Sequence, residues 1–457
     1  MVTTTPAVVI AAPASGSGKT TLATGLIGAL RNAGRRVAPF KVGPDFIDPG
    51  YHTLAAGLPG RNLDPVLVGA DRVGPLYRHG SAGADIAVVE GVMGLFDGRI
   101  EPNSAAPATG STAHVAGLLR APVVLVVDAT GHSQSIAAVL HGFATFDSGT
   151  RIAGVILNRV GSPRHEEVLR QACDVVGIPV LGAIPRDTVL SVPSRHLGLI
   201  TAVEHGIQAR AAVDAMTTLV ARHVDIAAVA GLATAHVAAE PWDPVTEVGD
   251  PVGSRPVLAL AGGRAFSFSY AEHAELLRAA GAEVVDFDPL TEALPQGTAG
   301  LLLPGGFPEQ YPAELSANAE LRQQIRGLAQ YAPIHAECAG LTYLVSELDG
   351  HPMCGVLAGK AHFTQRLTLG YRDAVALSDS PLYQTGSRAR GHEFHRTTVD
   401  FAEDYPPAWG FGVGDRTVRD GAVHGNVHAA YLHTHPAGQP ESVRRLVSSA
   451  HDTARAC

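Results

Sequence analysis

A glycine-rich loop near the start of the chain has the residue types and the spacing to bind phosphate. The segment from Ala11 to Thr21 reads AAPASGSGKTT, follows an apolar run and opens a helix-like stretch. Backbone N–H groups freed by the glycines can point at phosphate oxygens, and the helix N-terminus adds partial positive charge. The candidate nucleotide contacts are Ser15, Gly16, Ser17, Gly18, Lys19, Thr20 and Thr21. We therefore expect ATP to bind here, with Lys19 on the outer phosphates and the Thr20 hydroxyl on Mg²⁺.

Two loops farther along the chain supply the carboxylates that an Mg·ATP site needs, because Mg²⁺ prefers oxygen ligands. In the first, Lys41 ends a predicted strand and Asp45 and Asp48 follow it. In the second, Glu90 ends a strand and Asp97 follows in a glycine-rich loop. Asp45 and Glu90 fall where a sheet binds its ligands, which favours a functional role for both. For Asp48, a role as a plain turn former stays equally open.

A cysteine in the second half of the chain has the setting of a nucleophile. Cys338 lies in the segment HAECAGL, between an apolar strand and a helix-like stretch at Leu341–Leu348. A tight turn there would expose the thiol, and the helix N-terminus would favour its thiolate. Gly305 and Gly306 follow another strand and could offer backbone N–H groups as an oxyanion hole. His433 is the candidate base that activates the thiol.

The Cys338 motifs resemble the class I-type glutamine amidotransferases, in their cobalamin-pathway branch. The resemblance implies that the cysteine attacks the amide carbon of L-glutamine, releases ammonia and leaves a glutamyl thioester. Two departures stand out: Ala336 replaces a glycine that many relatives carry, and His435 replaces the acid of the usual His-x-Glu. We therefore expect a Cys338–His433 dyad and leave its third member open. The histidines lack a Cys or carboxylate partner at ligand spacing, so we expect no metal site among them.

These candidate residues depend on strands that bring them to one edge of a sheet. The first half alternates short Val/Ile/Ala runs with helical stretches, which indicates a mostly parallel, doubly wound sheet. Its later predicted strands are Val37–Val42, Asp85–Glu90, Val123–Asp128, Gly154–Asn158 and Pro179–Ile184. Polar residues stand at their carboxyl ends, where such sheets bind ligands. We expect Lys41 to contact ATP and Asn158 to hydrogen-bond its base, a capping role being equally open for Asn158.

A change in composition predicts two domains. Residues 228–255 are rich in Ala, Pro, Asp and Gly with no clear period, which is typical of a linker. They separate an ATP-dependent, carboxylate-activating domain at 1–227 from a second α/β pattern at 256–450, the amidotransferase domain. A closing helix is predicted after Ala437.

Composition narrows the classes of partner. The chain has 457 residues, 46% of them hydrophobic and 17% charged, which excludes extended disorder. The net charge of −9 comes with no basic block, so we expect no nucleic-acid partner. No apolar run is long enough for a bilayer, and we expect no membrane association. Four scattered cysteines favour reduced thiols and a cytoplasmic location.

The phosphate loop with Pro13 and the segments KVGPDFIDP and EGVMGLFDG together resemble the cobyrinic or hydrogenobyrinic acid a,c-diamide synthase family, which hydrolyses glutamine. The resemblance covers almost the entire chain. It implies a dethiobiotin synthetase-like P-loop domain followed by the amidotransferase domain. It also implies that Asp45 and Glu90 complete the Mg²⁺ site with Thr20. Asp48 and Asp97 would then lie near the carboxylate being activated.

The resemblance implies ATP-dependent amidation of the a and c acetate groups of a corrin precursor, through acyl phosphates, in cobalamin biosynthesis. The alternative is a cobyric acid synthase-type enzyme, which amidates other corrin side chains. The wording of the motifs favours the cobalt-free corrin, with the cobalt-containing one still open. The order of the two amidations, the path of ammonia, the corrin-binding residues and the oligomeric state also stay open, a homodimer being one candidate.

Overall fold

The computed structural model describes residues 4–100, 107–186, 194–195, 198–199 and 201–456, and it divides into two compact units. Unit 1 extends to Trp242 and unit 2 begins at Asp243, so the division falls inside the predicted linker. Much of that segment is bound to one unit or the other. The N–H of Thr234 donates to Ala7 O at 3.0 Å within unit 1, and the N–H of Val252 donates to Ala280 O at 3.0 Å within unit 2.

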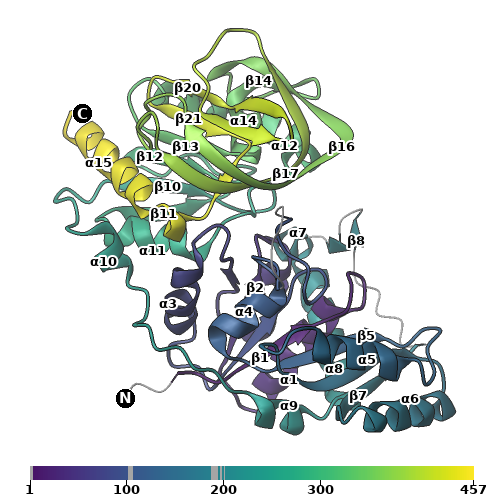
Figure 1. The fold of residues 1–457 in the computed structure, drawn as a ribbon. Helices are drawn as coiled ribbons and strands as arrows, with labels where there is room; N and C mark the ends of the chain where they lie inside the picture. The colour runs from purple at the N-terminus through teal and green to yellow at the C-terminus, as the bar shows by residue number, and fades with distance from the viewer. Residues whose placement is uncertain (1–3, 101–106, 187–193, 196–197, 200, 457) are drawn as a thin grey trace. The chain divides into compact units, whose positions relative to one another are not determined.

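The core of unit 1 is a seven-stranded parallel sheet in the order β3-β2-β4-β1-β5-β6-β7 (Figure 1). Its strands are β1 (Ala7–Ala11), β2 (Val37–Val42), β3 (Arg61–Leu63), β4 (Ile86–Glu90), β5 (Val123–Asp128), β6 (Ile152–Val160) and β7 (Val180–Pro185). β1, β2 and β4 are buried along their full length, as expected of apolar strands covered on both faces. The predicted doubly wound parallel sheet is confirmed.

Helices connect most strands of the unit 1 sheet, and among the described residues three more follow its last strand. They are α1 (Lys19–Asn32), α2 (Asp48–Ala56), α3 (Ala70–Gly80), α4 (Thr112–Leu119), α5 (Ile136–Phe146), α6 (Pro163–Val175), α7 (Ala202–His205), α8 (Ile207–His223) and α9 (Ile226–Leu232), with a small hairpin of β8 (Ser194–Arg195) and β9 (Gly198–Leu199). α1 packs closely on α8 because Gly28 has no side chain: a Cβ there would overlap Oγ1 of Thr217. This packing fixes the helix that carries Lys19 and Thr20 at its start.

The order of strands explains where a ligand site forms in unit 1. β1 lies between β4 and β5, so the chain winds in opposite directions on its two sides. In such sheets, the loops at the carboxyl ends beside this reversal leave a crevice for ligands. The phosphate loop follows β1, Lys41 lies near the end of β2 and Glu90 ends β4. The predicted gathering of these residues at one edge is therefore confirmed.

Unit 2 contains two sheets. The first has the order β11-β10-β12-β13-β21-β20, parallel except for the last pair. Its strands are β10 (Val257–Ala261), β11 (Glu283–Phe287), β12 (Thr298–Leu303), β13 (Ile334–Glu337), β20 (Ala422–His424) and β21 (Val427–Ala430). The helices are α10 (Pro244–Val248), α11 (Ala271–Ala279), α12 (Pro312–Ala317), α13 (Ala319–Leu328), α14 (Ala339–Leu344) and α15 (Pro440–Ala456), with 3₁₀ turns at Pro308–Gln310 and Pro436–Gly438. α15 is the predicted closing helix.

The second sheet of unit 2 was not predicted. It joins β14 (Val345–Leu348), β15 (His351–Pro352), β16 (Leu357–Ala376), β17 (Arg388–Phe401), β18 (Trp409–Val413), β19 (Arg416–Asp420) and β22 (His433–Thr434). The long antiparallel pair β16–β17 dominates it (Figure 1). The predicted helix over Leu341–Leu348 is wrong in its second half, because α14 ends at Leu344 and β14 then pairs with β16.

Candidate active sites

The phosphate loop of unit 1 has the backbone shape that its sequence predicts. Gly16 and Gly18 adopt φ values of 81° and 97°, in the left-handed region that favours glycine. Ser17 Oγ donates to Ala14 O at 2.9 Å across the loop. From β6, Asn158 Nδ2 donates to Ser17 O at 2.9 Å. Asn158 therefore contacts the loop itself, and its predicted contact with the nucleotide base stays a prediction.

Lys19 lies over the loop and reaches the segment that follows β4. Its Nζ donates to Met93 O at 2.6 Å and to Ala14 O at 3.4 Å. Burial lowers the pKa of Lys19, as does the neighbouring charge of Lys41. Met93 has a left-handed φ of 46°, an uncommon conformation for a residue with a side chain and one that gathers at functional sites.

Beside the loop, a buried charge cluster joins Thr20, Lys41, Asp48 and Glu90. Thr20 Oγ1 lies 2.6 Å from Glu90 Oε1 and 3.2 Å from Asp48 Oδ2. Lys41 Nζ contacts the same two oxygens, at 2.8 Å and 2.6 Å. Three oxygens thus converge on one point from α1, α2 and β4. Hydroxyl and carboxylate oxygens are the donors that Mg²⁺ prefers, so this set fits the ion.

In the structure Asp45 holds a turn, and its predicted role as an Mg²⁺ ligand stays a prediction. Its Oδ1 accepts the N–H groups of Ile47 at 2.7 Å and Asp48 at 3.0 Å, in the turn that starts α2. Asp48, expected on the substrate side, is instead the aspartate bonded to Thr20. The reason is local: the turn held by Asp45 begins a helix whose first residue then faces the loop.

His52 is a member of this cluster that the sequence reasoning missed. Its Nε2 lies 2.7 Å from Glu90 Oε2, with both side chains fully buried. Burial alone would raise the pKa of Glu90, but Lys41 and His52 lower it, so Glu90 is ionised. The pKa of Asp48 is raised by burial beside Asp45 and Glu90. The spacing from Asp48 to His52 was the available signal, because residues four apart share one face of a helix.

The loop after β4 carries Asp97 toward the phosphate loop. The N–H of Leu95 donates to Ala12 O at 2.8 Å, which holds the two loops together. Asp97 Oδ2 accepts the N–H of Gly94 at 3.0 Å, and the Asp97 charge acts on the pKa of Lys19. Asp97 therefore lies on the Lys19 side of the site, with its predicted role toward substrate still a prediction.

In unit 2, Cys338 occupies the predicted turn between β13 and α14. Its φ of 50° and ψ of −97° are strained for a residue with a side chain, as in a nucleophile elbow. Burial raises the pKa of the thiol, and hydrogen bonds from the backbone N–H groups of Gly306 and Ala339 oppose that rise. Sγ also lies 3.8 Å from Phe394 O.

Backbone N–H groups beside Cys338 are candidates for an oxyanion hole. The N–H groups of Gly306 and Ala339 both hydrogen-bond the Cys338 thiol, and the predicted oxyanion-hole role of Gly306 stays a prediction. The ring of His433 packs against Gly305, and a Cβ there would overlap the ring, while the predicted role of the Gly305 N–H stays a prediction. The residue after the nucleophile is the usual donor in such elbows, which was the overlooked signal.

His433 lies fully buried in β22, and its ring packs against Gly305, the neighbour of the Gly306 whose N–H bonds to Cys338. Burial lowers the pKa of His433 to about 4, against the opposing charge of Glu337. Nδ1 of His433 lies 3.9 Å from Glu337 Oε2. His435 is turned elsewhere: its Nδ1 accepts the N–H of Ala437, and its ring packs on Tyr270.

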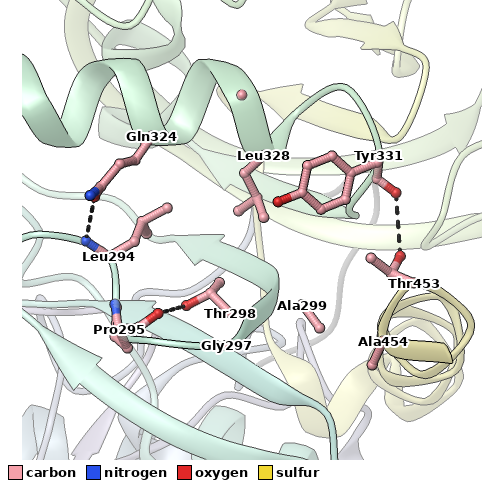
Figure 2. Close-up of a pocket in the computed structure, with 11 residues that line it drawn as sticks. Leu294, Pro295, Gly297, Thr298, Ala299, Gln324, Leu328, Tyr331, Thr453 and Ala454 are labelled. Carbon is pink, nitrogen blue, oxygen red and sulfur yellow. Dashed lines mark hydrogen bonds between the residues drawn. The ribbon is translucent and has the colours of Figure 1, made fainter. Parts of the chain in front are cut away.

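A cavity of about 650 Å³ lies apart from these residues (Figure 2). It is lined mainly by apolar groups between the start of β12, α13 and α15. Leu294 N–H donates to Gln324 Oε1 and Thr453 Oγ1 donates to Tyr331 O at its rim, as Figure 2 shows. None of the predicted site residues lines it.

The described residues contain neither a cluster of three metal-binding side chains nor a helix that could span a membrane. Within residues 4–100, 107–186, 194–195, 198–199 and 201–456, no three His, Cys, Asp or Glu side chains group as a metal site. The oxygen set at Thr20 has two carboxylates and one hydroxyl, so it is not a group of this kind. No helix within the same described part of the chain combines the length and the apolar character needed to span a membrane.

Comparison with known proteins matches both units to family models. Residues 8–200 match the CobQ/CobB/MinD/ParA nucleotide binding domain, and residues 258–440 match the CobB/CobQ-like glutamine amidotransferase domain.

Curated relatives match over nearly their full length. A hydrogenobyrinate a,c-diamide synthase from Mycobacterium tuberculosis is 69% identical over 97% of this chain and 98% of its own. A Streptomyces coelicolor protein of the same name is 54% identical over 97% of each chain. A cobyrinate a,c-diamide synthase from Gloeobacter violaceus is 42% identical over 96% of each.

Proposed function

The chain belongs to the a,c-diamide synthase family of glutamine-hydrolysing ligases, and on that premise we propose how its residues divide the reaction. The enzyme uses ATP and glutamine to convert the a and c acetate carboxylates of a corrin precursor into amides, in cobalamin biosynthesis. Unit 1 activates the carboxylate and unit 2 supplies the ammonia.

In unit 1, a corrin carboxylate attacks the γ-phosphorus of ATP, ADP leaves, and an acyl phosphate forms. The N–H groups of the loop and the Lys19 ammonium bind the phosphates of ATP. On binding, the phosphate oxygens replace Met93 O and Ala14 O as hydrogen-bond partners of Lys19 Nζ. Thr20, Asp48 and Glu90 would hold Mg²⁺, which supplies charge neutralisation at the phosphates when bound. Lys41 stands beside the same carboxylates and balances their charge.

In unit 2, Sγ of Cys338 attacks the amide carbon of glutamine while His433 takes the thiol proton. The N–H groups of Gly306 and Ala339 stabilise the oxyanion. His433 then gives that proton to the departing ammonia, and water hydrolyses the thioester to glutamate. The ammonia displaces phosphate from the acyl phosphate and forms the amide.

The observation that carries this proposal is the strained Cys338 turn, with two backbone N–H groups aimed at its sulfur. A buried cysteine without a catalytic role has no need of either feature. The charge cluster at Thr20 supports the ATP-dependent half of the proposed reaction.

For the corrin itself, we propose the cobalt-free hydrogenobyrinic acid. The relatives of 69% and 54% identity bear that name, whereas the 42% relative is named for the cobalt-containing acid. We further propose a cytoplasmic enzyme, supported by the free thiols of Cys173, Cys338 and Cys354. A homodimer stays a proposal that light scattering of the purified protein can test.

The test is to incubate the purified protein with ATP, Mg²⁺ and glutamine, separately with hydrogenobyrinic and cobyrinic acid, and to weigh the products. We expect a diamide, formed faster from hydrogenobyrinic acid. Equal or faster turnover of cobyrinic acid would contradict the choice of corrin. A product with more than two amides would instead support the cobyric acid synthase-type alternative.

A further inference from the structure

One buried carboxylate connects the nucleophile turn with the strand of the base. Glu337 ends β13 and directly precedes Cys338, and only 4% of its surface is exposed. Its Oε1 accepts the backbone N–H of Thr434 at 3.0 Å and the Thr434 hydroxyl at 2.9 Å. Its Oε2 lies 3.9 Å from Nδ1 of His433. β13 and β22 belong to different sheets, so Glu337 bridges the two.

The surroundings of Glu337 keep it charged. Burial would raise its pKa, but His335, His433 and His273 lower it to about 2. Nε2 of His335 lies 3.4 Å from Oε1. A buried charged carboxylate is costly unless it is paired and hydrogen-bonded. Glu337 has such partners and stays ionised beside the base, which indicates that the site uses its charge.

We infer that Glu337 is the third member of the Cys338–His433 site, a positioning residue that replaces the acid missing at position 435. It acts through His433, by holding the proton on Nδ1 so that Nε2 is the atom that takes the proton of Cys338. It then stabilises the imidazolium formed by that transfer, without taking the proton itself. The distance of 3.9 Å exceeds that of a hydrogen bond, and such contacts often tighten only when substrate binds.

Other charged groups near His433 are already engaged or carry the wrong sign. Glu393 contacts Arg372 Nε at 2.5 Å and lies 3.5 Å from Nε2 of His395. Among the described residues, the other groups whose charge acts on the His433 ring include His335 on β13 and His395 on β17, and His433 in turn acts on His392. Glu337 is therefore the carboxylate placed to orient Nδ1. The inference rests on the proposed roles of Cys338 and His433.

The test compares Glu337→Gln with Glu337→Asp in the full-length protein. Gln still accepts hydrogen bonds from Thr434 but has no charge, whereas Asp keeps the charge on a shorter side chain. We expect Glu337→Gln to lower kcat for glutamine hydrolysis by about 10²–10³-fold, with little change in KM and with an altered pH profile of kcat/KM. Glu337→Asp should restore part of the rate. Amidation with ammonium chloride should stay at the wild-type rate in both variants.

Two controls separate positioning from structure. Glu347→Gln makes the same change on β14, where Glu347 pairs with Lys360, and should leave all rates unchanged. Thr434→Val removes one hydrogen bond to Glu337 but keeps the charge, so it should cost far less than Glu337→Gln. Glutamine hydrolysis by Glu337→Gln within threefold of wild type, or equal rates for the Gln and Asp variants, would overturn the inference. Glutamine hydrolysis that survives Cys338→Ser would overturn the proposed function instead.

Discussion

At the scale of single residues, burial favours the neutral forms of the Cys338 thiol and of its base. Burial raises the pKa of the thiol and lowers that of His433 to about 4. A preformed thiolate–imidazolium pair is therefore disfavoured. Since His433 is unprotonated at neutral pH, it is ready to accept the thiol proton as the sulfur attacks.

The role of Cys338 predicts how its variant divides the two nitrogen sources. Cys338→Ser should abolish amidation with glutamine, because the hydroxyl is a far weaker nucleophile in this site. Amidation with ammonium chloride should continue, because unit 1 needs only ammonia and an acyl phosphate. Product mass after incubation with each nitrogen source measures both activities. Equal loss of the two would show that the assigned role is wrong.

A change at Glu90 should affect the ATP-dependent half of the reaction and spare glutamine hydrolysis. It is fully buried and contacts Thr20, Lys41 and His52, so Glu90→Gln removes the ionised carboxylate at the centre of the ATP site. We expect ATP-dependent turnover to fall by at least roughly 10²-fold, with basal glutamine hydrolysis retained. Phosphate release and ammonia release, measured on one preparation, check this. Retained amidation would exclude Glu90 from the metal site.

At the scale of elements, the sequence predicted the parts whose signals are local. The apolar composition of the strands that carry Lys41 and Glu90 at their carboxyl ends predicts those strands. The alternation of strands with helices predicts their parallel order. The β16–β17 pair was not predicted because its strands are partly exposed and lack a continuous buried run of apolar residues. The contact of Asp48 with Thr20 and the position of Glu337 opposite His433 join residues far apart in the chain, and no spacing reveals them.

The turn after β12 gives a prediction at this scale. The ring of His433 packs directly on Gly305, so the Cβ of Gly305→Ala would overlap it and displace the base. We expect glutamine hydrolysis to fall by at least roughly 10²-fold, with a cost of about 1–3 kcal/mol in stability from overpacking. Amidation from ammonium chloride is the control. An unchanged rate of glutamine hydrolysis would mean that the ring need not hold this position.

At the scale of the whole molecule, one chain carries both an ammonia source and an ammonia acceptor. Ammonia released without an acyl phosphate is wasted, and the neutral Cys338 thiol is consistent with low basal reactivity. We therefore expect glutamine hydrolysis to speed up when ATP and corrin are both present. Glutamate production with each ligand alone and with both measures this, and a constant rate would argue against coupling.

Buried histidines make unit 2 sensitive to acid. Burial lowers the pKa of His273 and His433 to about 4, and that of His392 and His428 to about 3, from an ordinary value of 6.5. Below pH 6.5 the unfolded chain binds protons at these positions and the folded chain does not. Stability therefore falls as the pH drops from 6.5 toward 4, by up to about 1.4 kcal/mol per pH unit for each histidine.

Asp420 has the opposite effect on the pH dependence of stability, but it is one group against four histidines. Burial raises its pKa from 3.8 to about 6, so its folded form is the better proton acceptor between those values, and acid stabilises it there. The histidines should prevail, and the unfolding temperature should fall steeply between pH 7 and pH 5. Calorimetry of the full-length protein across this range measures it. His428→Gln removes one titrating ring and should flatten the dependence, whereas a flat wild-type profile would show that these histidines are not buried in the neutral form.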